Sequence, residues 1–218
     1  MKKNGFTLAE VLITLAIIGV VATLTLPALM NNTAEQQAVT AFKKGLNTLT
    51  IAAETNEAID NFNFDSITED SNIDKSDAGE TPSLYALLAT RGSVDHQKSG
   101  GGKAYKVGKT GNTGNFCVYF RDGSLLMFPA EKSKINTTVE DDNMTHGISA
   151  IFDYNGDKMP NAVSNCNGTP DMSEEGASDT VDQCSDRAKR VIKDRFAVRL
   201  RGHYAVPNGA AARWAFNK

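Results

Sequence analysis

The first apolar pattern in the chain is a long run close to the N-terminus. From Phe6 to Met30 the only charged residue is Glu10. As a helix rising about 1.5 Å per residue, this run spans roughly 37 Å, enough to cross a bilayer core of about 30 Å. Lys2 and Lys3 precede it, and no basic residue follows before Lys43. The positive-inside rule therefore leaves the first residues in the cytoplasm and sends the rest outward.

Beyond this run the apolar spacing becomes that of an amphipathic helix. Five residues follow steps of three and four and form one stripe: Val39, Phe42, Leu46, Leu49 and Ala53. We expect the helix to continue past Pro27 to about Ile59 and to pack this stripe against a globular domain. Pro27 lacks a backbone donor, so we expect a kink or an unwound stretch between Gly19 and Pro27. The alternative is that Pro27 marks the end of the membrane helix.

Further along, polar stretches separate short apolar runs. Asn61–Pro82 is acidic and poor in apolar residues, which is typical of an exposed loop, and Leu84–Thr90 is expected to form a short helix. Two apolar runs within Phe116–Phe128 flank an Asp-Gly turn, which indicates a hairpin. More strands are expected at Ile148–Tyr154 and Arg195–Arg201, and turn-rich loops elsewhere. The pattern predicts an α+β fold, with one long helix laid on a small antiparallel sheet.

Composition and charge narrow the classes of function. The 218 residues are 40% hydrophobic with a formal net charge of -3, which fits one anchor plus one folded domain. This balance argues against a general nucleic-acid binder, which would present a basic face. Local patches remain candidates, around Lys103, Lys106 and Lys109 or between Arg187 and Arg201.

The chain contains three cysteines, Cys117, Cys166 and Cys184, and no C-x-x-C pair, so a structural zinc site has little support. Cys166 and Cys184 flank a polar loop. A disulfide between them is one expectation if the domain lies outside the cytoplasm, and Cys117 is then buried in a strand. The other reading is three isolated thiols.

Three interpretations compete for the N-terminal run. A secretory signal peptide would need an A-x-A-like site after its apolar core, and LPALMNNTA, residues 26–34, supplies none. A plain membrane anchor explains the length and the lysines. It does not explain Glu10, because a lone carboxylate in hydrocarbon costs several kcal/mol.

The third interpretation rests on the letters G-F-T-L-A-E at Gly5–Glu10. This stretch resembles the processing site of type IV prepilins and of the pseudopilins of type II secretion. The resemblance covers about the first quarter of the chain. It implies that a prepilin peptidase cuts after Gly5 and methylates the new terminus, Phe6. It also implies that Glu10 of one subunit pairs with the Phe6 amine of its neighbour, which offsets the desolvation of the carboxylate. The alternative is that Glu10 lies near the membrane surface, protonated or hydrated.

The resemblance implies a leader over residues 1–5 and a membrane or filament-core helix over 6–30. An amphipathic helix over 31–60 and an α+β domain over 61–218, in the periplasm or outside the cell, would follow. The expected function is a structural subunit of a pilus-like filament, most of all a type II secretion pseudopilin. Expected partners are other subunits, the prepilin peptidase, the inner membrane, and an assembly platform with its ATPase. The alternative is a minor pilin that binds a ligand such as DNA.

A second resemblance lies in FDYNGDKMPN, residues 152–161. Pilin-like proteins often show a D-x-N-G-x-x-x-P-N stretch after a strand, and in the major pseudopilin a nearby loop binds calcium. Asp153, Asn155 and Asp157 place oxygen ligands at alternate positions, which suits calcium. The glycine is misplaced for an EF-hand, and the long insert at 162–193 departs from the major pseudopilin. A structural turn without a cofactor is therefore the expected role, and calcium is the alternative.

The sequence gives little reason to expect catalysis. His96, His146 and His203 are scattered, and no G-x-S-x-G, H-E-x-x-H or C-x-x-C is present. GKAYKVGKT at 102–110 resembles a P-loop, but it has five residues between its glycines where the pattern needs four. We therefore expect a protein that is not an enzyme.

Overall fold

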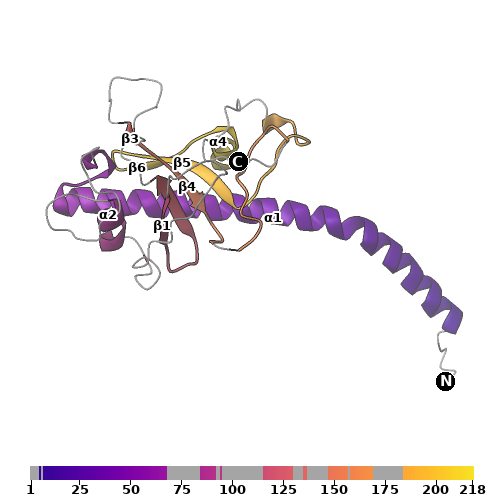
Figure 1. The fold of residues 1–218 in the computed structure, drawn as a ribbon. Helices are drawn as coiled ribbons and strands as arrows, with labels where there is room; N and C mark the ends of the chain where they lie inside the picture. The colour runs from indigo at the N-terminus through magenta and orange to yellow at the C-terminus, as the bar shows by residue number, and fades with distance from the viewer. Residues whose placement is uncertain are drawn as a thin grey trace. The chain divides into compact units, whose positions relative to one another are not determined.

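The computed structural model describes residues 5, 7–67, 84–91, 94, 115–129, 135–136, 147–156, 158–168 and 184–218. The chain divides into two compact units, Met1–Gln37 and Ala38–Lys218. The first unit contains the N-terminal part of helix α1 (Leu8–Asp60). The second contains the rest of α1 and every other labelled element (Figure 1).

Helix α1 ends at Asp60, one residue beyond the predicted end, and Pro27 lies inside it. The helix is continuous through Gly19 and Pro27, so the predicted unwound stretch is wrong, and so is the alternative that Pro27 ends the helix. A proline removes one backbone donor, which a long apolar helix tolerates more easily than a break that exposes several polar groups. Whether Pro27 kinks the helix stays a prediction.

The sheet is antiparallel, with strand order β1-β2-β4-β5-β6 and a short β3 that also pairs with β4. The strands are β1 (Asn115–Tyr119), β2 (Leu125–Pro129), β3 (Ile135–Asn136), β4 (Gly147–Asp153), β5 (Arg195–Arg201) and β6 (Tyr204–Pro207). The predicted hairpin and the predicted strands at 148–154 and 195–201 are therefore confirmed. The long helix on an antiparallel sheet confirms the α+β class, and it is consistent with a type IV pilin-like fold.

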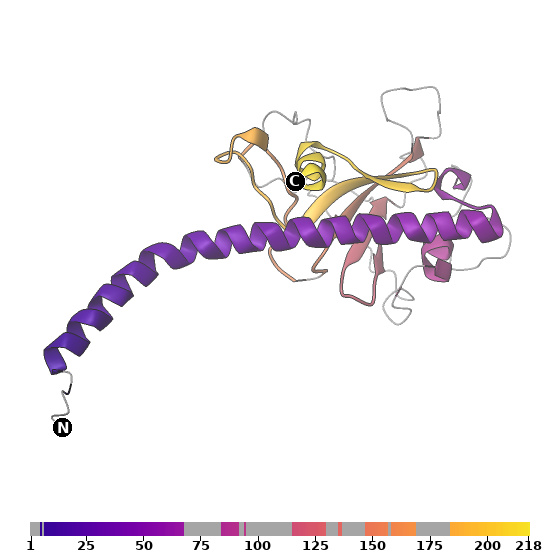
Figure 2. The same ribbon diagram turned by 180° about the vertical axis from the view of Figure 1, so that it is seen from behind.

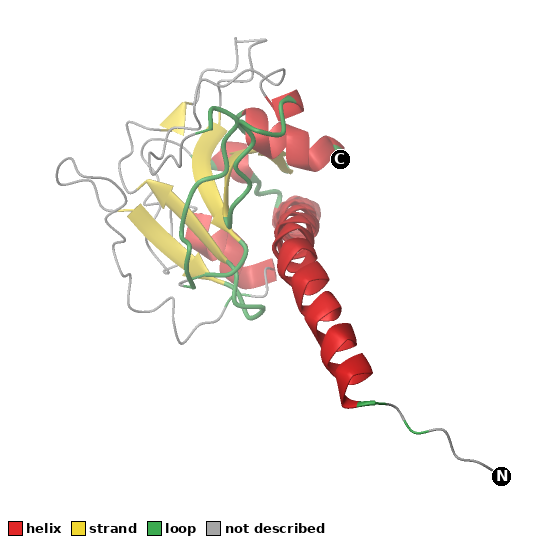
Figure 3. Ribbon diagram, turned by 90° about the vertical axis from the view of Figure 1, so that its right-hand side faces the viewer, coloured by secondary structure: helices red, strands yellow, loops and turns green. Residues whose placement is uncertain are grey.

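The α1 half that belongs to the second unit lies along one face of the sheet (Figures 2 and 3). All five residues of the predicted stripe are buried there. Phe42 of α1 stacks on Phe196 of β5, with ring centroids 4.3 Å apart. At Gly45 the helix backbone comes so near that an added Cβ would overlap the ring of Phe152, so any larger residue here would displace that ring.

Side chains alternate between the two faces of the sheet, as the period of a strand dictates. Leu126, Val118 and Val198 join the core under α1, whereas Leu125 and Met127 belong to a separate cluster. Every buried residue of the described core lies within Ala38–Lys218. The second unit therefore carries a complete hydrophobic core of its own and is able to fold without the first.

Three segments that we expected to be loops instead form η1, β6 and α4. Phe64 and Ile67 are each 1% exposed, because Asn63 caps a short 3-10 helix, η1 (Phe64–Ser66), that turns both side chains into the core. Strand β6 forms because Gly202 turns the chain back along β5. Helix α4 (Ala210–Asn217) forms from an alanine-rich segment and buries its alanines. The expected short helix is present as α2 (Leu84–Arg91).

Candidate functional site

Thr7 and Glu10 form a reciprocal hydrogen-bond pair at the start of α1. Glu10 Oε2 accepts hydrogen bonds from the Thr7 backbone N–H at 2.8 Å and from its hydroxyl at 2.9 Å. In return the Glu10 N–H donates to Thr7 Oγ1 at 3.3 Å. This T-x-x-E arrangement is a capping box, which satisfies backbone donors that have no partner in the first helical turn. Phe6 lies outside the described residues.

One oxygen of Glu10 is left over in this arrangement. Both hydrogen bonds from Thr7 reach Oε2, and within the described part of the chain Oε1 has no partner. Glu10 itself is exposed. The cap thus uses one oxygen of the carboxylate, and a cation is able to bind the other.

The helix that follows exposes its apolar side chains all around. Leu8, Ile17 and Leu24 are each more than half exposed, as are most large apolar residues up to Met30. Length and composition make α1 a candidate membrane span, and none of its most apolar window is buried. This feature matches a single-pass membrane anchor.

The D-x-N-G-x-x-x-P-N stretch surrounds a buried ion pair between Asp153 of β4 and Arg195 of β5. Arg195 Nε donates to Asp153 Oδ2 at 2.8 Å, and both side chains are at most 4% exposed. Asp153 Oδ1 accepts the backbone N–H groups of Asn155 and Gly156, each at 3.1 Å. Burial raises the pKa of Asp153 to about 6, although the Arg195 hydrogen bond acts to lower it.

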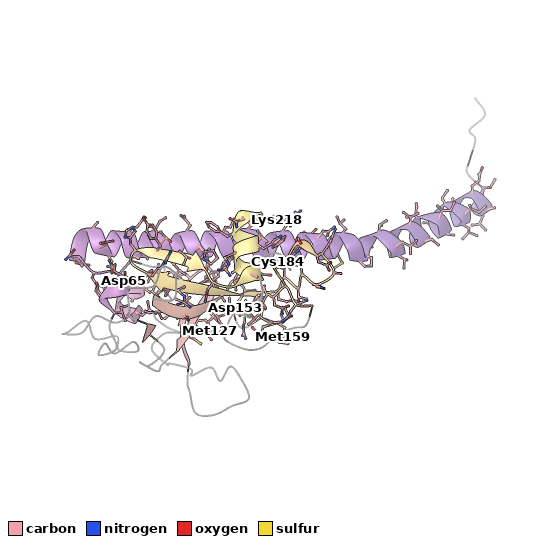
Figure 4. All side chains as sticks on the ribbon, turned by 90° about the horizontal axis from the view of Figure 1, so that it is seen from above. Asp65, Met127, Asp153, Met159, Cys184 and Lys218 are labelled. Atoms are coloured by element: carbon pink, nitrogen blue, oxygen red, sulfur yellow. A yellow bond between two sulfur atoms is a disulfide. The ribbon has the colours of Figure 1, made fainter. Side chains whose placement is uncertain are left out.

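The second half of the same stretch is fixed by the neighbouring residue, Asp194. Its two carboxylate oxygens accept the backbone N–H groups of Asn161 at 2.6 Å and Ala162 at 2.8 Å. Asn161 has a positive φ of 53°, which asparagine tolerates better than most residues. Its side-chain oxygen accepts a hydrogen bond from Arg195 Nη2 at 3.0 Å. The stretch is thus a turn held between β4 and β5 (Asp153 is labelled in Figure 4).

The structure does not bring the three predicted calcium ligands together as a described site. Asp157 lies outside the described residues, and within them there is no group of three metal-binding side chains. Asp153 fits a calcium ligand poorly in this arrangement, because Arg195 and two backbone amides already use both its oxygens. Asn155 Oδ1 is buried without a hydrogen-bond partner. Calcium binding therefore stays an untested prediction.

Cys166 and Cys184 form a disulfide, with Cα atoms 4.9 Å apart, and Cys117 is buried in β1. The disulfide packs on α4 through Ala210 and Ala211 (Cys184 and Lys218 are labelled in Figure 4). Arg190 contacts both the disulfide and α4. Its guanidinium donates to the Cys184 carbonyl at 3.2 Å and lies 4.1 Å from the centre of the Trp214 ring.

The remaining predicted residues form no catalytic arrangement in the described part of the chain. His203 Nδ1 lies 2.8 Å from Glu57 Oε2 and does not approach a nucleophile there. His96, His146, Lys103, Lys106, Lys109 and the P-loop-like stretch fall outside the described residues.

Sequence reasoning missed Thr7, Asp194 and Arg195 as partners of the residues it singled out. The capping role of Thr7 could have been predicted, because T-x-x-E before an apolar run is a signature of a helix start. The ion pair could not have been predicted, because Asp153 and Arg195 are 42 residues apart in the sequence.

Comparison with known proteins gives one finding, at the N-terminus. Searches of curated proteins and of solved structures found no match to the chain. A family model, the prokaryotic N-terminal methylation motif, matches residues 1–26. These residues include Gly5, Thr7 and Glu10, together with most of the apolar run. The chain therefore carries the N-terminal methylation motif, consistent with the type IV prepilin-like family and with a structural role of the pilin type.

Proposed function

We propose that the protein is a structural subunit of a type IV pilus-like filament, most specifically a pseudopilin of type II secretion. The precursor is cut after Gly5 by a prepilin peptidase and methylated at Phe6. An inner-membrane platform with its ATPase then extracts the subunit from the membrane into the filament. The α+β domain faces the periplasm or the cell exterior.

The observation that carries this proposal is the start of α1. A fixed carboxylate, Glu10, with one oxygen unused by its own cap, begins a helix whose apolar side chains are unburied. A bundle of such helices buries those side chains, and the Phe6 amine created by cleavage supplies the missing cation. In a helix that stays alone in the bilayer, the acid serves only as a cap, and its charge remains costly in hydrocarbon.

The disulfide supports an extracytoplasmic domain. Both sulfur-bearing residues are fully buried, and the bond closes between positions 18 residues apart. Structural disulfides of this kind form and persist in oxidising compartments. Lys2 and Lys3 support a cytoplasmic position for the N-terminal end of the precursor.

N-terminal mass spectrometry of the protein isolated from its native membrane tests the proposal. We expect a mature chain that begins with N-methylated Phe6. A Gly5→Leu variant should keep Met1, because the residue before the cut can no longer be recognised. An uncut wild-type chain would make the protein an ordinary anchored domain, and a cut near Asn31 would make it a secreted one.

A second candidate, a ligand-binding minor pilin, has one favourable observation. Residues 184–218 contain nine Lys and Arg against two Asp, and Arg187, Lys189, Lys193 and Arg213 are exposed. Against it, Arg195 is already paired with Asp153. The segment that precedes these residues in the sequence, 167–183, contains five acidic residues and no basic one, which lowers the net positive charge of this region. Salt-dependent DNA binding by the second unit, Ala38–Lys218, would support the minor-pilin candidate, and the absence of binding at low salt would exclude it.

A further inference from the structure

A cavity of about 330 Å³ lies within the second unit, between α1 and the hairpin β1–β2. Its apolar surface comes from Leu49 of α1, Phe120 after β1 and Phe152 of β4, which are all at least 94% buried. The volume is in the range of sites for small organic molecules, which are concave, largely apolar and lined by a few polar groups. The two aromatic side chains provide apolar contact area for the body of a ligand.

Arg121 and Asp122, from the turn between β1 and β2, and Lys44 of α1 supply the charged groups of this cavity. Asp122 Oδ1 accepts hydrogen bonds from the Ser124 backbone N–H at 3.1 Å and its hydroxyl at 2.6 Å. Asp122 Oδ2 lies 2.9 Å from Lys44 Nζ of α1. Burial acts to raise the pKa of Asp122, but the bonds from Ser124 and Lys44 outweigh it and the pKa is lowered. Asp122 is therefore ionised, and it neutralises Lys44.

Arg121 is the charge that remains. It lines the same cavity, is exposed, and within the described residues has no carboxylate partner. The cavity thus combines an aromatic wall with one guanidinium that has no carboxylate partner among the described residues, and a guanidinium pairs well with carboxylates and other oxyanions. A neutral ligand would form no ion pair with Arg121. The second charge of a dianion would be repelled by the carboxylate of Asp122.

We propose that this cavity is a binding site for a small amphipathic monoanion: an aromatic or aliphatic body that lies against Phe120 and Phe152, and one carboxylate or sulfonate that binds Arg121. This site is independent of the filament proposal, because all its residues belong to the second unit. The subunit would then respond to, or carry, such a molecule whichever filament it forms.

Two fluorescent probes with nearly the same aromatic body test the proposal. The probes are 1-anilinonaphthalene-8-sulfonate, a monoanion, and N-phenyl-1-naphthylamine, which is neutral. Both brighten in apolar sites, so titrations of the soluble unit, residues 38–218, give their affinities without a background from membrane or detergent. We expect the anion to bind more tightly, and its advantage to shrink as salt rises, because exposed charges are screened.

Two variants locate the binding. Arg121→Gln should weaken the anionic probe by about three- to fivefold, the size of a partly exposed charge pair, and leave the neutral probe unchanged. Thr48→Phe fills the cavity from α1 and should abolish binding of both probes. The matched controls are Arg187→Gln, another exposed arginine, and Thr55→Phe, two turns further along α1. Neither control should change either affinity.

Circular dichroism and an amide NMR spectrum must show that each variant keeps the native fold, since partly folded states also bind the anionic probe. Failure of the wild-type unit to bind either probe would overturn the proposal. So would an unchanged anion affinity in Arg121→Gln, or an equal loss in Thr48→Phe and Thr55→Phe. The filament proposal is unaffected by all of these results, since it is read from the N-terminus of the mature chain.

Discussion

Thr7 donates two hydrogen bonds to a single oxygen of Glu10 and leaves the other oxygen without a partner in the described chain. The acid in the apolar helix therefore has two separable roles. One oxygen caps the helix inside the subunit. The other has no partner among the described residues, and under the proposed function it binds the Phe6 amine of a neighbouring subunit.

The capping role predicts that Thr7→Val frays the first turn of α1, whereas Thr7→Ser preserves it. Loss of such a cap costs about 1 kcal/mol, so amide hydrogen exchange at Leu8 to Val11 should speed up roughly fivefold in bilayer nanodiscs. Thr14→Val is the matched control. Thr14 lies two turns along, and its hydroxyl bonds only the Val11 carbonyl. Equal exchange in Thr7→Val and Thr14→Val would show that the capping box is not formed.

The second role predicts that Glu10→Gln separates processing from assembly. Glutamine keeps an oxygen for Thr7 but removes the charge that would meet the neighbour's Phe6 amine. Mass spectrometry should still find a chain that begins at Phe6. Sedimentation of sheared filaments should find little of the variant in the pellet. If filaments of Glu10→Gln form as abundantly as those of the wild type, the charge pair does not drive assembly.

The parts of the fold that follow local rules were predictable from the sequence. The stripe from Val39 to Ala53 has helical spacing, and Arg195–Arg201 alternates as a strand does, so both elements appear where predicted. The hairpin is also local. Asp122 and Gly123 form its turn, and Gly123 has the positive φ of 89° that such loops need.

What could not be predicted depends on contacts between distant positions. Ala205 on β6 donates its N–H to Thr50 Oγ1, 155 residues earlier, so a strand that looks weak in sequence is held by α1. Phe64 and Ile67 enter the core although their surroundings are acidic, because burial of two large side chains outweighs the local polarity. The Asp153–Arg195 pair, and hence the meaning of the D-x-N-G stretch, depends on the β4–β5 register.

The buried ion pair predicts a large loss of stability in Arg195→Met. The change leaves Asp153 buried without its cation, which typically costs about 3–5 kcal/mol. Urea unfolding of the soluble unit at pH 7 measures it. Lys44→Met removes the cation of the exposed pair with Asp122 and should cost less than about 1 kcal/mol. Similar losses in the two variants would mean that burial does not decide the value of these pairs.

The pKa of Asp153 predicts the pH dependence of the same site. In the folded chain it is about 6, against an ordinary value of 3.8, because burial disfavours the carboxylate. The folded state then binds the proton more tightly than the unfolded state. The contribution of this group to stability is therefore full below pH 3.8 and is lost as the pH rises through 6.

A titration followed by the carboxyl carbon resonance of Asp153 should show a midpoint near pH 6. In Arg195→Met the midpoint should move higher, since Arg195 acts to lower the pKa, and acidification from pH 7 should recover part of the lost stability. A wild-type midpoint below 4 would show instead that Arg195 and the two backbone donors outweigh burial.

The disulfide predicts that the docking of α4 depends on oxidation. Cys166 and Cys184 pack against Ala210 and Ala211, and Arg190 joins the bond to Trp214, the only tryptophan in the chain. Replacing both cysteines by serine should destabilise the soluble unit by about 3 kcal/mol, from the loss of a closed loop of this size. Trp214 should become more accessible to quenchers, because α4 loses a buried partner.

Cys117→Ala, which leaves the disulfide intact, should change the quenching little. If quenching of Trp214 is the same with and without the disulfide, α4 is held by the sheet alone, and the bond stabilises only the segment around Cys184.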